Sequence, residues 1–166
     1  MAEVVHKAEV VLPLTIRDLT RDDLPSCTWT GSPESSFAAA LDRAGRGEVD
    51  YLVACPPSGL PVAVGGIDYA LSAGAGTLYQ VAVHGAVQSC GIGTLLIGTA
   101  EQRIRARGLL RAELAVELNN PRARALYQRL GYIAYGSRPE EWDEQADDGS
   151  VSRYRTVCTL MRKELG

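Results

Sequence analysis

The sequence predicts an α/β or α+β fold, in which helices flank a mixed, partly parallel twisted sheet of six to seven strands. Three short strand-like runs follow one another in the first half of the chain. Beyond them, strand and helix patterns alternate, which implies right-handed crossovers between parallel strands. The 166 residues fit one domain, 1–166, without internal repeats and with 1–10 as a loose leader.

The first third of the chain is expected to hold one strand and then helices. Residues 12–19 alternate apolar and polar side chains, which is typical of a strand. Thr20 is suited to cap a helical turn that runs into the acidic residues 22–23, because carboxylates are favourable at a helix N-terminus. A second helix is expected to be capped by a serine, Ser35 or Ser36, and to stop at the glycines 45 and 47.

Three consecutive strands are predicted next, as an antiparallel meander. Residues 50–56 form a short apolar run that ends in two prolines. Residues 61–72 follow a turn that contains proline, serine and glycine, and residues 76–85 form the third run.

The period of the pattern then changes. Apolar residues recur every three or four positions from Ile92 to Ile104 and Gly108 follows, which predicts an amphipathic helix with a glycine stop. Residues 110–118 return to a strand pattern. Asn120 and the proline after it predict the N-cap and first position of another helix.

The end of the chain predicts two further strands. Gly131 ends the preceding helix, and residues 132–136 and 152–161 have strand composition. Between them, the residues 139–149 carry six carboxylates and are expected to form an acidic loop.

Composition excludes several classes of protein. The net charge is −3, from 17 basic and 20 acidic residues, whereas proteins that bind nucleic acid are usually basic. We expect no membrane span, because no run of 18 apolar residues exists, and the N-terminus does not resemble a secretory signal. The four cysteines and two histidines lack metal-site spacing, so we expect no metal and reduced thiols in a cytoplasmic protein.

Residues 88–94 contain a Gly-x-Gly turn between a strand and a helix. Glycines let the backbone approach a ligand closely, and the first helical turn offers unpaired amides at the positive end of the helix dipole, which suits phosphate. The turn lacks the Lys-Ser/Thr of a P-loop, and Leu96 stands at the last glycine of the dinucleotide fingerprint. Taken alone, Gly-x-Gly is as often a structural turn.

VAVHGAVQSCGIGTLLIGTAE (81–101) resembles motif A of the GNAT superfamily of acyl-CoA N-acyltransferases, where Q/R-x-x-G-x-G/A joins the fourth strand to a helix. NNPRARALYQRLGY (119–132) resembles motif B of the same family, about 30 residues later. The resemblance covers about residues 76–135. Many members have Arg-Gly where this chain has Gln88 and Ser89, and many have a proline where this chain has Gly85.

The resemblance implies acetyl-CoA as cosubstrate. By analogy the strand at 81–83 would pair with the pantetheine arm, the turn would cradle the pyrophosphate, and the second motif would lie near the pantetheine end. The residues so implied are Val81, Ala82, Val83, Gln88, Ser89, Cys90, Gly91, Ile92, Gly93, Thr94, Asn120, Ala123 and Tyr127. The arginines between 103 and 129 are mostly a solvated helix face, of which some could approach the 3′-phosphate.

Tyr127 would protonate the departing thiolate, because a tyrosine with an ordinary pKa of about 10 stays protonated at neutral pH. Packing of Tyr127 within its helix is the alternative.

The family often places a glutamate on the fourth strand as the general base, but here that strand lacks a carboxylate. Glu117 is the leading substitute, followed by Asp68 and Glu113, and each is also compatible with a plain solvated strand residue. His84 is interpreted as a turn residue, whereas Trp29 and Trp142 either stack on an acceptor or cover a core edge.

The sequence is compatible with two functions. The first is an N-acetyltransferase that transfers an acetyl group to a primary amine by direct attack, with a small-molecule or peptide acceptor drawn by the acidic loop. The second is a coenzyme A-binding sensor or regulatory module without catalysis; a nucleotide-binding protein is disfavoured. The acceptor, the acyl group and the oligomeric state, monomer or homodimer, do not follow from the sequence.

Overall fold

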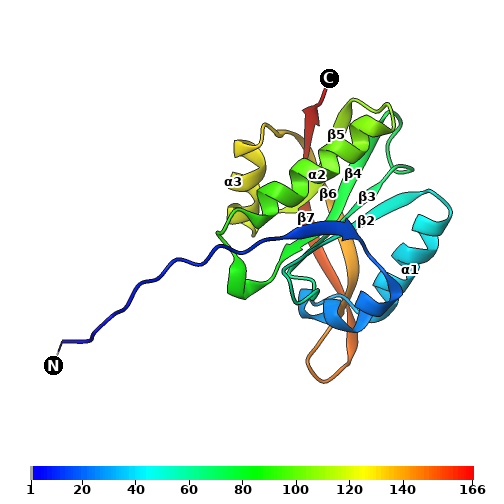
Figure 1. Cartoon of the computed structure of the whole chain (residues 1–166). Helices are drawn as coiled ribbons and strands as arrows, with labels where there is room; N and C mark the ends of the chain where they lie inside the picture. Colours follow the sequence, from blue (N-terminus) through cyan, green and yellow to red (C-terminus); the bar gives the residue numbers. More distant parts are fainter. Residues whose placement is uncertain (1) are drawn as a thin grey trace.

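Seven strands form one sheet in the order β1-β2-β3-β4-β5-β7-β6 in the computed structural model, which describes residues 2–166 (Figure 1). This confirms the predicted mixed sheet with flanking helices. In chain order the elements are β1 (Thr15–Asp18), the 3-10 helix η1 (Arg21–Thr30), α1 (Glu34–Gly45), β2 (Val49–Cys55), β3 (Ala63–Asp68), β4 (Ala75–Val83), the 3-10 turn η2 (Gly85–Val87), α2 (Ile92–Ala106), β5 (Arg111–Glu117), α3 (Pro121–Arg129), β6 (Ile133–Gln145) and β7 (Val151–Glu164).

The strand order divides the sheet into two parts. Strands β1 to β4 form the predicted antiparallel meander. Strand β4 then pairs in parallel with β5, across the α2 connection, which gives the partly parallel sheet. Strand β7 lies between β5 and β6 and is antiparallel to both.

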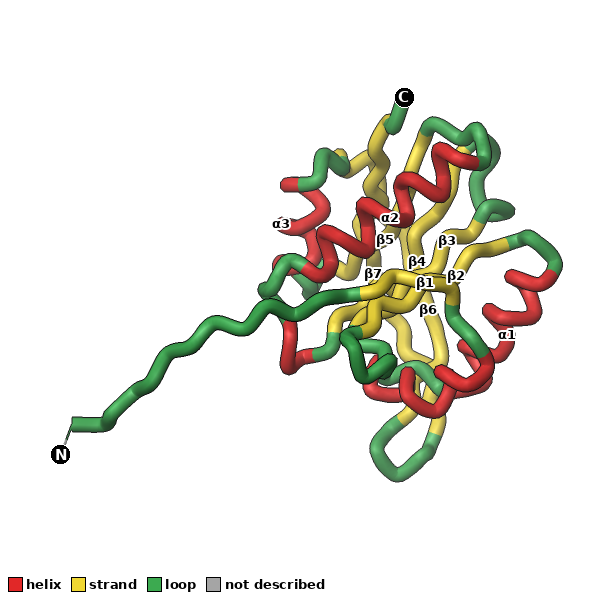
Figure 2. Tube along the Cα trace, in the orientation of Figure 1, coloured by secondary structure: helices red, strands yellow, loops and turns green. Residues whose placement is uncertain are grey.

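Helices cover both faces of the sheet. Helices α2 and α3 lie over one face and α1 with η1 over the other, as the tube view shows (Figure 2). Each face of the sheet has its own hydrophobic core, and the side chains of β2 point alternately into one and the other. Leu52 and Ala54 pack toward α2, whereas Tyr51 and Val53 pack toward α1. We call these the α2 face and the α1 face.

The N-terminal third differs from the prediction in three details. Residues 2–14 have no regular structure, so the first strand begins at Thr15 and not at residue 12 as predicted. The N-terminal part of this segment runs away from the body of the molecule (Figure 1), whereas Leu14 packs against the core of the α2 face. Thr20 is the N-cap as predicted, but the helix that follows is 3-10 throughout and contains Pro25. Helix α1 begins at Glu34, so neither serine caps it; Pro33 is the N-cap, and its extended backbone (φ −67°, ψ 153°) leads directly into the first turn.

The predicted acidic loop at 139–149 is wrong. Residues 139–145 belong to β6, and only the short segment between Gln145 and Val151 is a turn. The acids are stable in a strand because arginines on β7 stand opposite two of them: Glu141 faces Arg155, and Asp143 faces Arg153.

A bulge in β4 shapes the centre of the molecule. The register between β3 and β4 shifts at Gln80, which has a left-handed backbone (φ 52°). The extra residue changes the alternation, so that Leu78, Val81 and Val83 all face α2. Beyond Leu78 and Leu114 the pairing of β4 with β5 ends although both strands continue, so the two strands diverge here.

Within residues 2–166, no helix is both long enough and apolar enough to span a bilayer.

Candidate functional site

A cavity of about 530 Å³ lies where β4 and β5 diverge, between β4 and the beginnings of α2 and α3. Its volume is in the range of small-molecule sites. The lining residues are Val81, Ala82, Val83, Val87, Gln88, Ser89, Gly91, Ile92, Gly93, Thr94, Asn120, Arg122, Ala123, Leu126, Tyr127 and Arg129.

The first wall of the cavity is the turn before α2. His84 caps η2 by accepting a hydrogen bond from the amide of Ala86 at Nδ1 (3.1 Å), as expected of a turn residue. Gly91 is the N-cap of α2 and has φ +83°, a conformation that suits glycine. No side chain caps α2, so its first amides present their donors and the positive end of the dipole to the cavity.

The second wall is the first turn of α3, which also begins at the cavity. Asn120 is its N-cap and accepts a hydrogen bond from the amide of Ala123 through Oδ1 (3.1 Å), with Pro121 at the first position as predicted. The Asn120 side-chain amide nitrogen can therefore donate to a ligand. Two helix N-termini thus point at one cavity.

Tyr127 lines the cavity from a buried position. Its side chain is buried, and its ring contacts that of Tyr132 edge to face (5.9 Å between centroids). Burial raises the pKa of Tyr127 to about 12, because the phenolate is poorly solvated there. The hydroxyl is consequently a proton donor over the whole neutral range.

The charge of the lining differs from that of the whole protein. The net charge is −3, yet the lining residues, all within the described chain, include Arg122 and Arg129 and no Asp or Glu. Together with the helix N-termini, these arginines make the cavity suitable for an anion.

Most of the site residues expected from the sequence meet in this cavity. Two do not line it: Cys90 is exposed, with Sγ directed at the Gln88 carbonyl oxygen (3.5 Å), and Glu117 lies outside it. Four lining residues were not predicted individually, the two arginines only as members of the group between 103 and 129: Val87, Arg122, Leu126 and Arg129. The helical period could have found Leu126 and Arg129, since they lie three and six residues after Ala123, on one side of α3.

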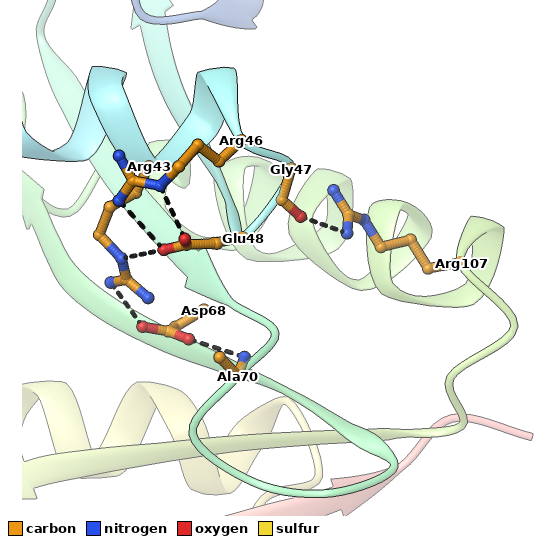
Figure 3. Close-up of polar contacts among 7 residues, drawn as sticks. All are labelled: Arg43, Arg46, Gly47, Glu48, Asp68, Ala70 and Arg107. Atoms are coloured by element: carbon orange, nitrogen blue, oxygen red, sulfur yellow. Dashed lines mark hydrogen bonds and ion pairs between the residues drawn. The ribbon is translucent and has the colours of Figure 1, made fainter.

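The three candidate bases have different surroundings. Glu117 ends β5 on the α1 face and accepts a hydrogen bond from the Tyr154 hydroxyl (2.7 Å). Asp68 is buried, bound to Arg43 (2.7 Å) and to the Ala70 amide (2.8 Å), within a network that joins α1 to β3 (Figure 3). Glu113 is paired with Arg111 (2.9 Å). Of the three, only Glu117 is held by a neutral donor and not by an arginine.

The two tryptophans also differ. Trp29 donates to the Pro61 carbonyl (3.2 Å) and its ring lies against His84, so it covers the edge of the core. Trp142 on β6 packs on Tyr154 of β7 (5.2 Å between centroids), next to Glu117. The inner side of the hairpin thus combines aromatic rings and carboxylates.

Among residues 2–166, no group of three or more His, Cys, Asp and Glu side chains is placed to hold a metal ion.

The profile described as "Acetyltransferase (GNAT) family" matches residues 15–132, which is more than half of the chain. The chain belongs to this family. A curated relative, the mycothiol acetyltransferase of Beutenbergia cavernae, is 43% identical over 60 residues, covering 36% of this chain and 20% of that protein. The matched stretch therefore spans about one fifth of the relative's length.

Solved structures of the family share the fold. The ribosomal-protein-S18-alanine N-acetyltransferase of Escherichia coli has a TM-score of 0.72 at 21% identity, over 93% of this chain and 95% of that one. The PaiA N-acetyltransferase of Thermoplasma acidophilum, in complex with coenzyme A, has a TM-score of 0.71 at 15% identity, over 92% and 99%. The spermidine N-acetyltransferase of Vibrio cholerae, with coenzyme A and spermine, has a TM-score of 0.69 at 19% identity, over 92% and 95%.

Proposed function

We propose that the protein transfers an acetyl group from acetyl-CoA to a primary amine. The observation that carries the proposal is the cavity described above: it has two helix N-termini, two arginines and no carboxylate among its described lining residues. Coenzyme A carries a pyrophosphate and a 3′-phosphate, so such a lining complements it. Family membership supports the same chemistry.

Each wall has a proposed role in binding. We propose that the amides of residues 88–94 cradle the pyrophosphate and that Arg129, which lines the cavity from the end of α3, binds the 3′-phosphate. The divergence of β4 from β5 leaves the backbone at Val81–Val83 beside the cavity, where a pantetheine arm can lie like an added strand. Asn120 donates from its side-chain amide to the same arm.

Tyr127 is the proposed general acid. The amine nitrogen forms a bond with the acetyl carbonyl carbon, the carbon–sulfur bond breaks, and the Tyr127 hydroxyl gives its proton to the leaving sulfur. The amine loses one proton to a base, so the products are an amide and the free thiol. The burial of Tyr127 favours its protonated form before the reaction.

The acceptor is proposed to approach from the α1 face. Glu117 projects from β5 on this face, beyond the point where the pairing of β4 with β5 ends, and the cavity lies on the α2 face beside the same divergence. Its carboxylate, held by Tyr154, is the proposed proton acceptor, directly or through water. The names of two structural neighbours specify amine acceptors, spermidine and a ribosomal-protein alanine, which supports an amine here as well.

We also propose that the described chain forms a single domain. The family match ends at residue 132, but β7 lies between β5 and β6 in the same sheet. Without it, β5 would lose one of its two partners.

The decisive experiment measures release of free coenzyme A from acetyl-CoA over a panel of amines, polyamines and peptides. We expect amine-dependent release and an N-acetylated product by mass spectrometry. Absence of any product across the panel, despite measurable binding of acetyl-CoA, would contradict the proposal.

A non-catalytic coenzyme A-binding module is the second candidate. One observation favours it: the described residues that line the cavity include no carboxylate or histidine to act as a base. Binding without turnover in the same assay would identify this function.

A further inference from the structure

We propose that Arg122 is a pyrophosphate-binding residue, supplied by α3 and held in place by the turn that precedes α2. The inference deepens the proposed function and rests on it, because it concerns how the same cavity recognises coenzyme A. It assigns a guanidinium from a different helix to the phosphate cradle.

The contacts of Arg122 place it over the turn. Its Nη1 donates to Oε1 of Gln88 (3.0 Å), and its Nη2 donates to Oγ of Ser89. Gln88 is itself fixed, because its Nε2 donates to the carbonyl oxygen of Val83 at the end of β4 (3.1 Å). A chain of hydrogen bonds thus runs from β4 through the turn to the first turn of α3.

The partners of Arg122 are uncharged. An amide oxygen and a hydroxyl orient the guanidinium without neutralising it, and two of its five N–H donors serve these contacts. Ten of the chain's arginines form ion pairs with carboxylates elsewhere in the described structure. At Arg122 the positive charge is instead held at the rim of a cavity that already suits an anion. A phosphate oxygen there would receive charge-assisted hydrogen bonds.

The two residues that hold Arg122 are those at which the turn departs from the Arg-Gly form of its motif. Ser89 has a left-handed backbone (φ 61°), a conformation that favours glycine, yet its hydroxyl is what contacts the guanidinium. Gln88, which the motif allows as well as arginine, supplies a neutral acceptor for the guanidinium. The guanidinium beside the turn therefore comes from α3.

The test measures dissociation constants by calorimetry for coenzyme A and dephospho-coenzyme A, which lacks the 3′-phosphate. We expect Arg122→Gln to weaken both about 10- to 100-fold, the range of a charge-assisted hydrogen bond. Arg124→Gln is the matched control on α3, because Arg124 does not line the cavity, and it should change either constant less than about 2-fold. Thermal unfolding of each variant reports whether it is folded.

An exchange of the two side chains separates charge from structure. Because Gln88 and Arg122 touch, the double variant Gln88→Arg/Arg122→Gln returns a guanidinium to the same place. We expect it to recover most of the affinity lost in Arg122→Gln, which a merely structural role would not predict.

Three results would overturn the assignment: unchanged affinity in Arg122→Gln, a loss seen for coenzyme A but absent for dephospho-coenzyme A, or failure of the exchanged variant to recover binding. If the wild-type protein bound neither compound, the proposed function would fall together with this inference. If the wild type bound both and only the variants behaved otherwise, the inference alone would fall.

Discussion

At the scale of single residues, Tyr127 illustrates how position determines chemistry. A tyrosine on the apolar side of a helix normally packs, and Tyr127 does pack against Tyr132. It also lines the cavity, together with residues of β4 and of the first turn of α2. Its hydroxyl is therefore both buried and accessible to a ligand, which is the combination that a proton donor to a leaving group needs.

Tyr127→Phe should lower kcat much more than it changes the KM for acetyl-CoA. General acid catalysis contributes about 10²–10⁴-fold, and water could replace part of it. Because burial raises the pKa of Tyr127 to about 12, its proton is lost only far above neutrality, so the wild-type rate should show no alkaline decline from this group below about pH 10. If Tyr127→Phe kept the wild-type kcat, the Tyr127 hydroxyl would not be the proton donor and the side chain would serve only in packing.

Gly93 separates two elements at the cavity. A Cβ atom there would lie 3.3 Å from Cδ2 of Leu126 on α3 and 3.7 Å from Cγ2 of Val83 on β4. Gly93→Val should therefore displace α3 from α2, weaken acetyl-CoA binding about 10-fold or more, and destabilise the protein by about 1–3 kcal/mol through overpacking. Isothermal titration and urea unfolding measure the two effects.

Gly98→Val is the matched control, because Gly98 is also within α2 and a Cβ there would meet no atom within 4 Å. It should leave acetyl-CoA affinity unchanged. Equal losses in both variants would mean that any substitution in α2 acts through helix stability and not through the contact with Leu126.

At the scale of elements, the sequence predicted the helices and strands whose boundaries are set by residues close to one another in the chain. Helix α3 begins at Asn120 and Pro121 as expected, because a cap and a proline act on the backbone beside them. Strand β6 was missed between 139 and 145, because its acids are stabilised by arginines on another strand. The bulge at Gln80 was also missed, since a left-handed glutamine carries no local signature.

The site shows the same division. The turn before α2 and the motif of α3 are each a short continuous stretch of sequence, so most of the residues that line the cavity were predicted. Arg122 was not, because its role depends on contact with Gln88 and Ser89, more than thirty residues earlier. Glu117 was predicted as a base from its position on a strand, whereas its partner Tyr154 lies in a segment that the resemblance does not cover.

The contacts of Asp23 at the start of η1 predict how the free energy of unfolding depends on pH. Asp23 is bound by Arg17 (2.7 Å) and accepts from the Thr20 amide (2.8 Å), and these contacts, above all the bond to Arg17, lower its pKa to about 2. A lowered pKa gives stability that is present above the unfolded value of about 3.9 and is lost as the pH falls through about 2. Asp23→Asn should cost about 1–2 kcal/mol at pH 7, since Arg17 is partly exposed and solvent screens the pair.

Urea unfolding at pH 7 and in steps from pH 4 to pH 2 measures this effect. The wild type should lose stability over the acid range, whereas Asp23→Asn should lose less of it. Asp22→Asn, at an exposed neighbouring position, should behave like the wild type. An unaltered acid dependence in Asp23→Asn would show that another carboxylate dominates.

At the scale of the whole molecule, the two faces of the sheet separate the two proposed substrates. The α2 face holds the cavity with its arginines, and the α1 face carries Glu117 of β5, with Glu144 of β6 on the inner side of the hairpin. An anionic cosubstrate and a cationic acceptor would thus meet from opposite sides of a protein whose net charge of −3 favours only the acceptor.

The distribution of acids along the hairpin gives the last prediction. Glu141 and Asp143 form ion pairs with Arg153 on the outer side of the hairpin (both 3.1 Å), so their charge is already compensated. Glu117 and Glu144 instead accept hydrogen bonds from Tyr154 and from Trp142, which are neutral donors. If the acceptor is a cationic amine, the inner pair should attract it and the outer pair should not.

Glu144→Gln should raise the acceptor KM about 2- to 5-fold, the effect of removing a partly exposed charge. Glu117→Gln should raise it similarly and should also lower kcat by about 10²-fold or more, because the Glu117 carboxylate is the proposed proton acceptor. The outer variants Glu141→Gln and Asp143→Asn should leave the acceptor KM unchanged. Since exposed charges are screened over about 8–10 Å at physiological ionic strength, the wild-type kcat/KM for the acceptor should fall with added salt, and the double inner variant should flatten that dependence. If inner and outer variants shift the acceptor KM and its salt dependence equally, the hairpin acts only through overall charge, and the acceptor does not enter beside Glu117.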